Sequence, residues 1–312
     1  MPGDAPHLHG LLGGFWNHAG MNNDKKTAQG EPAKPSPKAP KIGQRQANRL
    51  CQMSPAGRLA FIAEGLPIIL TSAQGFWNAS AALTGSPREA EVLRGFAKEE
   101  AAKILVLMDL VRCPTTLLDD RLGTLVNRFY AHLDRLIYAQ VAEWWAEDIV
   151  RLRASIEPLR KTHYLEGNIG EYILPNSTLY NRESKLYADI EAYEDGAPLW
   201  NAPTVHSSGF PAWKPPVLAV TEAMSALGMF SLAGLKAVAE IWETTAFTGT
   251  ESLQDSERLM EQLVGRLIKE GLPSEQATPD HVGCLYRSWP LPLYDVDLKP
   301  IPVTIEELKE EQ

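Results

Sequence analysis

The chain has 312 residues, 44% of them apolar, which is enough for a sizeable core and excludes a chain that is disordered throughout. Its 30 lysines and arginines against 39 aspartates and glutamates give a net charge of −9, which argues against a protein that coats nucleic acid through a broad basic surface. Because the three cysteines, Cys51, Cys113 and Cys284, are widely spaced, we expect reduced thiols and neither a disulfide framework nor a cysteine zinc site.

The first segment, residues 1–48, is predicted to be a disordered basic arm. Pro, Lys, Gly and Gln dominate residues 20–48, so burial of apolar groups cannot offset the entropy cost of ordering them. The beginning of the sequence has no basic region followed by an apolar stretch, as a signal peptide would. No run of about 18 apolar residues occurs. The sequence therefore predicts a cytoplasmic protein with no membrane contact.

Helical signals begin at residues 54–70, where a Ser-Pro helix start precedes apolar residues at helical spacing. Pro67 is expected to kink or restart this helix. A second helix opens with a capping-box pattern at residue 86 and stops before Pro114. A third is predicted to begin near residue 119 and to continue to about residue 156.

The remaining chain is predicted to alternate between irregular and helical segments. Residues 163–215 are rich in Gly, Pro, Asn, Tyr and Trp, and we expect an ordered loop region with one short helix or extended piece near 182–189. Helix returns over 216–241 and 252–269, and the proline-spaced residues 289–303 are expected to run extended over the surface. With no convincing alternating strand, the class is all-α, with a helical domain at 49–250 and an acidic helical extension at 251–312.

Charged residues interrupt the apolar face of the second helix. Glu99 and Glu100 lie four and three residues before Lys103, which is the spacing of ion pairs on a helix. One interpretation is an ordinary surface pair, which contributes little to stability. The other is a partly buried ionic cluster, which needs internal partners and is often functional.

Arg128, His132 and Arg135 are spaced so that they share one face of the predicted third helix. Two neighbouring arginines favour a neutral imidazole, which can act as a base, while a guanidinium can bind phosphate. The alternative is a solvated polar face. No spacing resembles a metal site, a P-loop or a dinucleotide fingerprint, so neither a cofactor nor a metal is expected.

Three motifs, in order, resemble the AbiV-type abortive-infection family of the HEPN superfamily over about residues 50–245. Ala97-x-Glu99-Glu100-x-x-Lys103 is similar to the family's A-x-E-E-x-x-K helix motif. Phe129-x-x-His132-x-x-Arg135 is similar to its second motif, an aromatic, a histidine and a basic residue. The third, R-E-x-x-L-Y-V-D followed by W-x-x-P, is matched by Arg182 to Asp189 and then Trp200-x-x-Pro203.

The resemblance implies a HEPN-like helical bundle, a homodimer and a role in anti-phage defence. Many HEPN proteins are metal-independent endoribonucleases in which a histidine is the acid and base and an arginine, separated from it by four to six residues, stabilises the phosphorane. Here only three residues separate Arg128 from His132. The enzyme hypothesis makes His132 the acid and base towards an RNA substrate and Arg128 or Arg135 the phosphate clamp.

Two other functions stay open. The protein could be a non-catalytic defence effector or sensor that binds a phage-encoded or partner protein through its bundle, or a helical domain unrelated to defence. We expect Arg182 to reach Glu99 or Glu100, with Tyr187 and Trp200 pinning residues 163–215 to the bundle. One buried polar cluster would then contain Glu99, Glu100, Lys103, His132, Arg135 and Arg182.

Overall fold

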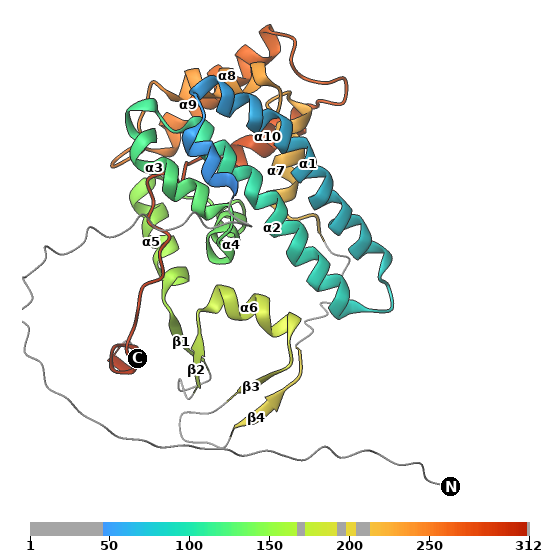
Figure 1. Cartoon of the computed structure of the whole chain (residues 1–312), viewed down its shortest axis with the longest axis vertical. Helices are drawn as coiled ribbons and strands as arrows, with labels where there is room; N and C mark the ends of the chain where they lie inside the picture. The colour runs from blue at the N-terminus through green and yellow to red at the C-terminus, as the bar shows by residue number, and fades with distance from the viewer. Residues whose placement is uncertain (1–45, 167–171, 192–197, 204–212, 311–312) are drawn as a thin grey trace, which may run out of the picture. The chain divides into compact units, whose positions relative to one another are not determined.

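The computed structural model describes residues 46–166, 172–191, 198–203 and 213–310 (Figure 1). The basic arm expected over residues 1–48 lies outside these ranges except for its last three residues, which begin a 3-10 helix, η1 (Gln46–Gln52). The described residues are mostly helical with only short strands, which confirms the all-α class. From Gln46 onward they belong to one compact unit, and the boundary expected between residues 250 and 251 stays a prediction.

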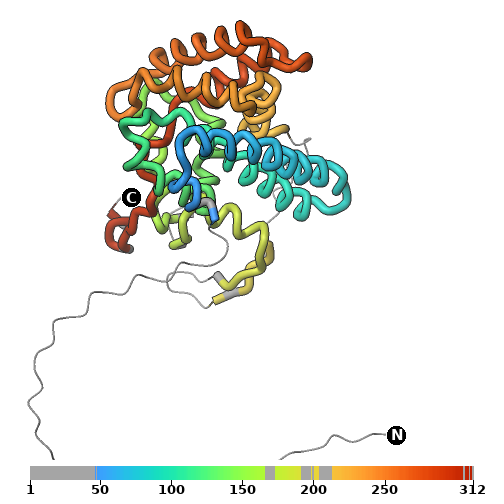
Figure 2. The backbone as a smooth tube through the Cα atoms, turned by 45° about the horizontal axis from the view of Figure 1, so that its top comes forward, coloured from blue at the N-terminus to red at the C-terminus, as the bar shows by residue number. Residues whose placement is uncertain are grey.

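Two long helices, α1 (Pro55–Ala82) and α2 (Pro87–Arg112), lie side by side in both views (Figures 1 and 2). α1 begins as the sequence predicts, because the Ser54 side chain accepts a hydrogen bond from the Gly57 backbone N–H and a proline follows. The helix passes through Pro67 without restarting. Pro67 is exposed, so water can reach the carbonyl that the proline leaves without a donor.

The expected third helix is three helices: α3 (Thr115–Arg128), α4 (His132–Val141) and α5 (Ile149–Arg160). Between α3 and α4 the backbone of Ala131 is extended. A new start at α5 comes from Asp148, whose side chain accepts a hydrogen bond from the Arg151 backbone N–H. Apolar residues keep helical spacing across both breaks, so periodicity alone could not reveal them.

The region expected to be irregular contains two short antiparallel hairpins around one helix (Figure 1). Strand β1 (His163–Glu166) pairs with β2 (Tyr172–Pro175), α6 (Ser177–Leu186) follows, and β3 (Asp189–Glu191) pairs with β4 (Leu199–Asn201). The Asn176 side chain caps α6 and also donates to the Leu159 and Lys161 carbonyls at the end of α5. This amide therefore fixes where α6 begins.

Five more helices complete the described fold: α7 (Pro216–Ala226), α8 (Leu232–Trp242), α9 (Leu253–Lys269), α10 (Pro279–Ser288) and α11 (Ile305–Glu310). α2 is the central helix, since it packs against α1, α3, α4, α6, α7 and α8. Residues 104–111 of α2 are buried on every side. That pattern is typical of a helix enclosed by others rather than of one at a surface.

Residues 289–298, which we call the buried strap, cross the core instead of running over the surface as expected. Their large apolar side chains are buried: Trp289, Leu291, Leu293, Tyr294, Val296 and Leu298. A non-helical segment can be buried only if its backbone polar groups find partners. Proline spacing carries no information about burial, and the backbone contains bends and a turn in which the Val296 N–H donates to the Leu293 carbonyl.

Charged side chains of α2 and α3 supply those partners. Arg112 donates from its two terminal nitrogens to the carbonyls of Trp289 (3.1 Å) and Leu291 (3.0 Å). Arg128 donates to the carbonyls of Leu293 (2.8 Å) and Val296. In return, one oxygen of Asp109 accepts from the Leu293 N–H at 2.7 Å, while the other accepts from Arg112 Nε at 2.7 Å.

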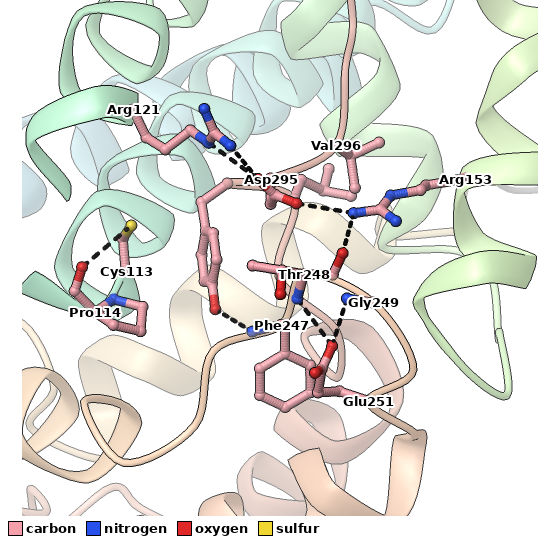
Figure 3. A network of polar contacts seen from close by, with 12 residues as sticks. Cys113, Pro114, Arg121, Arg153, Phe247, Thr248, Gly249, Glu251, Asp295 and Val296 are labelled. Carbon is pink, nitrogen blue, oxygen red and sulfur yellow. Dashed lines mark hydrogen bonds and ion pairs between the residues drawn. The ribbon is translucent and has the colours of Figure 1, made fainter. Parts of the chain in front are cut away.

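One residue of the buried strap, Asp295, reaches the edge of the core between two arginines (Figure 3). Arg121 of α3 lies 2.6 Å from one carboxylate oxygen, and Arg153 of α5 lies 2.8 Å from the other. Beside it, the Tyr294 hydroxyl accepts a hydrogen bond from the Phe247 N–H at 2.7 Å. The strap is therefore tied to α2, α3 and α5 and to the loop before α9.

Among the described residues, one helix, α1, is long and apolar enough to cross a membrane by length and composition. In the most apolar stretch of 18 residues of this helix, only 22% is buried inside the protein, and one side of the helix packs on α2. Core helices of water-soluble proteins can have the same length and composition. The absence of membrane contact therefore stays a prediction.

Candidate functional site

A single buried carboxylate brings three elements together. Glu99 lies on α2, and its side chain is only 5% exposed. Its Oε1 accepts a hydrogen bond from Arg182 Nε of α6 at 2.5 Å, as the sequence predicted for one of the two glutamates. Its Oε2 lies 2.8 Å from His132 Nδ1 and 3.1 Å from Arg135 Nη2, both on α4. We call these four residues the Glu99 cluster.

Local structure explains how the Glu99 cluster forms. The alanines at positions 97, 101 and 102 let neighbouring helices approach α2 closely around Glu99. His132 is the first residue of α4, and Arg135 follows three residues later on the same face. α6 crosses near the ends of α2 and α4 in Figure 1, and it packs against both helices. The Glu99 carboxylate of α2 therefore has partners on both α4 and α6.

The ring of His132 is oriented through Nδ1. This nitrogen lies 2.8 Å from Glu99 Oε2 and 2.7 Å from Arg135 Nη2, but it carries either a proton or a lone pair and can make only one of these hydrogen bonds. A lone pair facing an ionised carboxylate would be repulsive, whereas Arg135 reaches Glu99 directly. We therefore assign the proton to Nδ1, donated to Glu99, which leaves Nε2 as the acceptor.

The electrostatics of the cluster favour an ionised carboxylate. Burial raises the pKa of Glu99, but hydrogen bonds from Arg182 and His132 and the charges of both arginines outweigh it, so the pKa lies below its ordinary value. Burial lowers the pKa of Arg135, and the charges of Glu99 and Glu100 oppose that shift. Arginine stays protonated in proteins, so the cluster carries one negative and two positive charges around the imidazole.

Although Glu99 is buried, His132 is not. Its side chain is 51% exposed, and within the described part of the chain its Nε2 takes part in no hydrogen bond. An imidazole fixed at Nδ1 by a carboxylate and open at Nε2 is suited to accept and return a proton. The same arrangement also occurs where a histidine only caps or braces a fold.

Comparison of the chain with protein-family models, curated proteins and solved structures finds no match.

Two other predicted residues form a separate pair beside the Glu99 cluster. Lys103 and Glu100 are joined by an ion pair, and Lys103 Nζ lies 5.4 Å from the centre of the Phe129 ring. Both side chains are partly buried. The six residues expected to form one cluster are thus four joined around Glu99 and two in a neighbouring pair.

Arg128 is not part of this site. It ends α3 instead of sharing a helix with His132, and its guanidinium is committed to the buried strap. The chain break at Ala131 separates the two residues that the sequence placed on one helical face. The structure therefore leaves Arg135, and not Arg128, beside the imidazole.

The expectation that Tyr187 and Trp200 pin the loop-rich region is wrong, because both side chains are largely exposed. Arg88, which the sequence analysis did not single out, fixes the end of α6 instead. Its guanidinium donates to the carbonyls of Lys185 (3.1 Å) and Leu186 (2.7 Å). An arginine two residues into a predicted helix gives no local signal of such a contact.

A cavity of about 230 Å³ lies beside the Glu99 cluster, between α2, α4 and α6. Glu99 and Arg182 belong to its wall as well as to the cluster. The three cysteines are free, and among the described residues no group of three or more His, Cys, Asp or Glu side chains lies close enough to hold a metal. The chemistry available here is that of the imidazole, the carboxylate and the guanidinium groups.

Proposed function

We propose that this protein is a cytoplasmic anti-phage defence protein of the abortive-infection type, with a HEPN-like fold, that cleaves RNA without a metal. The observation that carries the proposal is the Glu99–His132 contact. A buried carboxylate fixes one ring nitrogen, and the other faces solvent. A solvated polar face would require neither the buried glutamate nor the two arginines that keep it ionised.

In the proposed reaction His132 Nε2 accepts the proton of a ribose 2′-hydroxyl while the O2′–P bond forms. The same proton passes to the leaving O5′ as the P–O5′ bond breaks. The products are a 2′,3′-cyclic phosphate and a 5′-hydroxyl, and atoms and charges balance without a co-reactant. Glu99 acts as a positioning residue, since it holds the ring orientation and stabilises the imidazolium that forms between the two proton transfers.

The positive charges of Arg135 and Arg182 support the same proposal. Both guanidinium groups are fixed by Glu99 before substrate arrives, so they need no rearrangement as negative charge develops on the phosphorane. Arg135 is the nearer candidate for the phosphate contact, because its Nη2 is 2.7 Å from the imidazole. We propose a homodimer as well, on the resemblance alone.

The test uses purified protein and total RNA in the presence of a chelator, with three proteins compared: the wild type, His132→Ala and His163→Ala. His163 is the matched control, because it is exposed and its Nδ1 lies 3.2 Å from the Thr162 hydroxyl. We expect cleavage by the wild type and by His163→Ala, and a loss of about 100-fold or more in His132→Ala. Intact RNA with the wild type, or equal cleavage by His132→Ala, refutes the proposal.

A second candidate is a non-catalytic defence effector that binds a phage-encoded or partner protein. The observation in its favour is the group of exposed apolar side chains on and next to β3 and β4: Tyr187, Ile190 and Trp200. Aromatic residues are enriched where proteins bind one another. Phage protection that survives His132→Ala but is lost on Trp200→Ser would favour this candidate over the enzyme.

A further inference from the structure

The cavity between α2, α4 and α6 has walls of two kinds. One is apolar, formed by side chains of all three helices that include Phe96, Leu136 and Leu186. The other is polar, with Arg94 of α2, Gln140 of α4 and Thr178 of α6. Its volume of about 230 Å³ is below the range for drug-sized ligands and suits a single ring system.

Each of the three polar residues has a buried atom without a hydrogen-bond partner in the described part of the chain. These atoms are Arg94 Nε, Gln140 Oε1 and Thr178 Oγ1, and Thr178 is only 4% exposed. Buried polar groups in folded proteins are nearly always paired, so three unpaired ones around one cavity need an explanation. Together they provide a donor, an acceptor and a hydroxyl that can be either.

The charges around the cavity indicate a neutral occupant. Arg94 forms an ion pair with Glu91, and Lys98 is paired with Glu143 at 3.2 Å. Two more cations line the wall: Arg182 is paired with Glu99, and Lys185 lies 3.9 Å from Glu91. These four cations lie beside three carboxylates of the same wall, so the cavity is close to neutral, and the phosphate contact stays with Arg135, which is outside the wall. A planar ring with mixed donors and acceptors on its edge fits better.

We propose that this cavity binds an unstacked nucleobase of single-stranded RNA, with Phe96 against the ring face and Thr178 and Gln140 reading the ring edge. Proteins that select RNA sequences bind splayed bases in this way. The inference rests on the proposed function, since it names the base selected by that same site. It adds a specificity determinant that the Glu99 cluster itself does not contain.

The position of the cavity relative to His132 fits this assignment. Leu136, on the cavity wall, lies four residues after His132, one helical turn of about 5.4 Å along α4. Glu99 contacts the imidazole and also lines the cavity. A base in the cavity therefore leaves its own sugar and phosphate within reach of the imidazole, so cleavage is expected next to the selected base.

The test compares the wild type with Thr178→Val, Gln140→Leu and Thr221→Val. Thr178→Val keeps the shape of the side chain but removes its hydroxyl. Thr221→Val is the matched control, because Thr221 is also buried, on α7, but its hydroxyl donates to the Leu218 carbonyl at 2.9 Å. Thermal unfolding without RNA is measured first. Removing an unpaired buried hydroxyl raises Tm in Thr178→Val, whereas removing a paired one lowers Tm in Thr221→Val.

Calorimetric titration with each of the four ribonucleosides then measures binding. Cleavage sites in a random-sequence RNA measure base preference. We expect one nucleoside to bind best, with affinity about tenfold weaker in Thr178→Val and Gln140→Leu and unchanged in Thr221→Val. The base preference beside the cleaved bond should weaken in the same two variants.

The outcomes separate the two proposals. Cleavage by the wild type with unchanged nucleoside binding and base preference in Thr178→Val and Gln140→Leu overturns the base-binding cavity and leaves the proposed function standing. No cleavage, together with nucleoside binding that these two variants weaken, supports the cavity and overturns RNA cleavage. If the wild type shows neither cleavage nor nucleoside binding, both proposals are overturned.

Discussion

Replacement of Arg112 by methionine tests whether the core depends on the buried strap. The Arg112 side chain is only 2% exposed, and it joins Asp109 to the carbonyls of Trp289 and Leu291. Its guanidinium also lies against two rings, 4.7 Å from the centre of Trp242 and 4.2 Å from that of Trp289. Methionine fills much of the same volume but can donate to none of these groups.

The expected loss can be estimated from these contacts. Breaking a buried ion pair by removing one partner costs about 3–5 kcal/mol, and each of the two carbonyls left unpaired adds about 1 kcal/mol. These contributions sum to about 5–7 kcal/mol, and because Asp109 keeps its hydrogen bonds from Tyr138 and from the Leu293 N–H, the total lies at the lower end, about 5 kcal/mol. At about 2–4 °C per kcal/mol, the midpoint of thermal unfolding should fall by about 10–20 °C.

Urea and thermal unfolding followed by circular dichroism measure this loss, with Arg121→Met as the matched control. Arg121 also contacts the strap, through Asp295, but it is 41% exposed and Arg153 holds the same carboxylate. Its replacement should cost about 1 kcal/mol or less. Equal losses in the two variants would refute the conclusion that buried arginine contacts hold the strap.

Two further predictions concern pH. Glu99→Gln should lose about 3–5 kcal/mol at pH 7, because two arginines then face each other without their carboxylate. Folding lowers the pKa of Glu99, so the carboxylate contributes its stabilisation above about pH 4.3, and this stabilisation is lost as pH falls through the pKa of the folded state. Urea unfolding at pH 7 and at pH 3.5 measures the difference in unfolding free energy between the wild type and Glu99→Gln. An equal difference at the two pH values would contradict this prediction. Burial raises the pKa of Asp134 to about 6, with Asp297 adding to the shift and Arg128 opposing it. The wild type should therefore lose stability as pH rises from about 4 through 6, and Asp134→Asn should lose less. By pH 7 the unfolding free energy of the variant, relative to that of the wild type, should have increased by up to about 3 kcal/mol. A difference between the two proteins that does not change with pH would show that the carboxyl titrates normally.

Local patterns in the sequence predicted the parts of the fold that depend on neighbouring residues. The Ser54 cap and the all-α class follow from caps and periodicity within a few turns, and α2 keeps its expected bounds although the Ser86 side chain makes no capping hydrogen bond. The contact between Arg182 and Glu99 was also predicted, although 83 residues separate them. That prediction followed from the third motif, which singled out Arg182 as a partner for an acidic group.

The parts that the sequence did not reveal depend on distant partners. Nothing near residues 289–298 shows that arginines and an aspartate of α2 and α3 will satisfy their backbone, so the segment looked like surface. Arg128 looked like a phosphate ligand for the same reason, since its real acceptors lie 165 and 168 residues away. The break at Ala131 was hidden because α3 and α4 bury apolar faces in phase.

The buried strap also has a consequence for biosynthesis. Asp109 and Arg112 leave the ribosome long before their partners, because 177 to 184 residues separate them from the backbone groups they bind. Until those residues are translated, Arg112 and Asp109 can pair with each other, but they lack their partners on the buried strap. The nascent helices must therefore wait in an open state, and the core closes in a late step. A ribosome stalled before residue 289 would hold a chain whose charged interior is a target for chaperones and proteases.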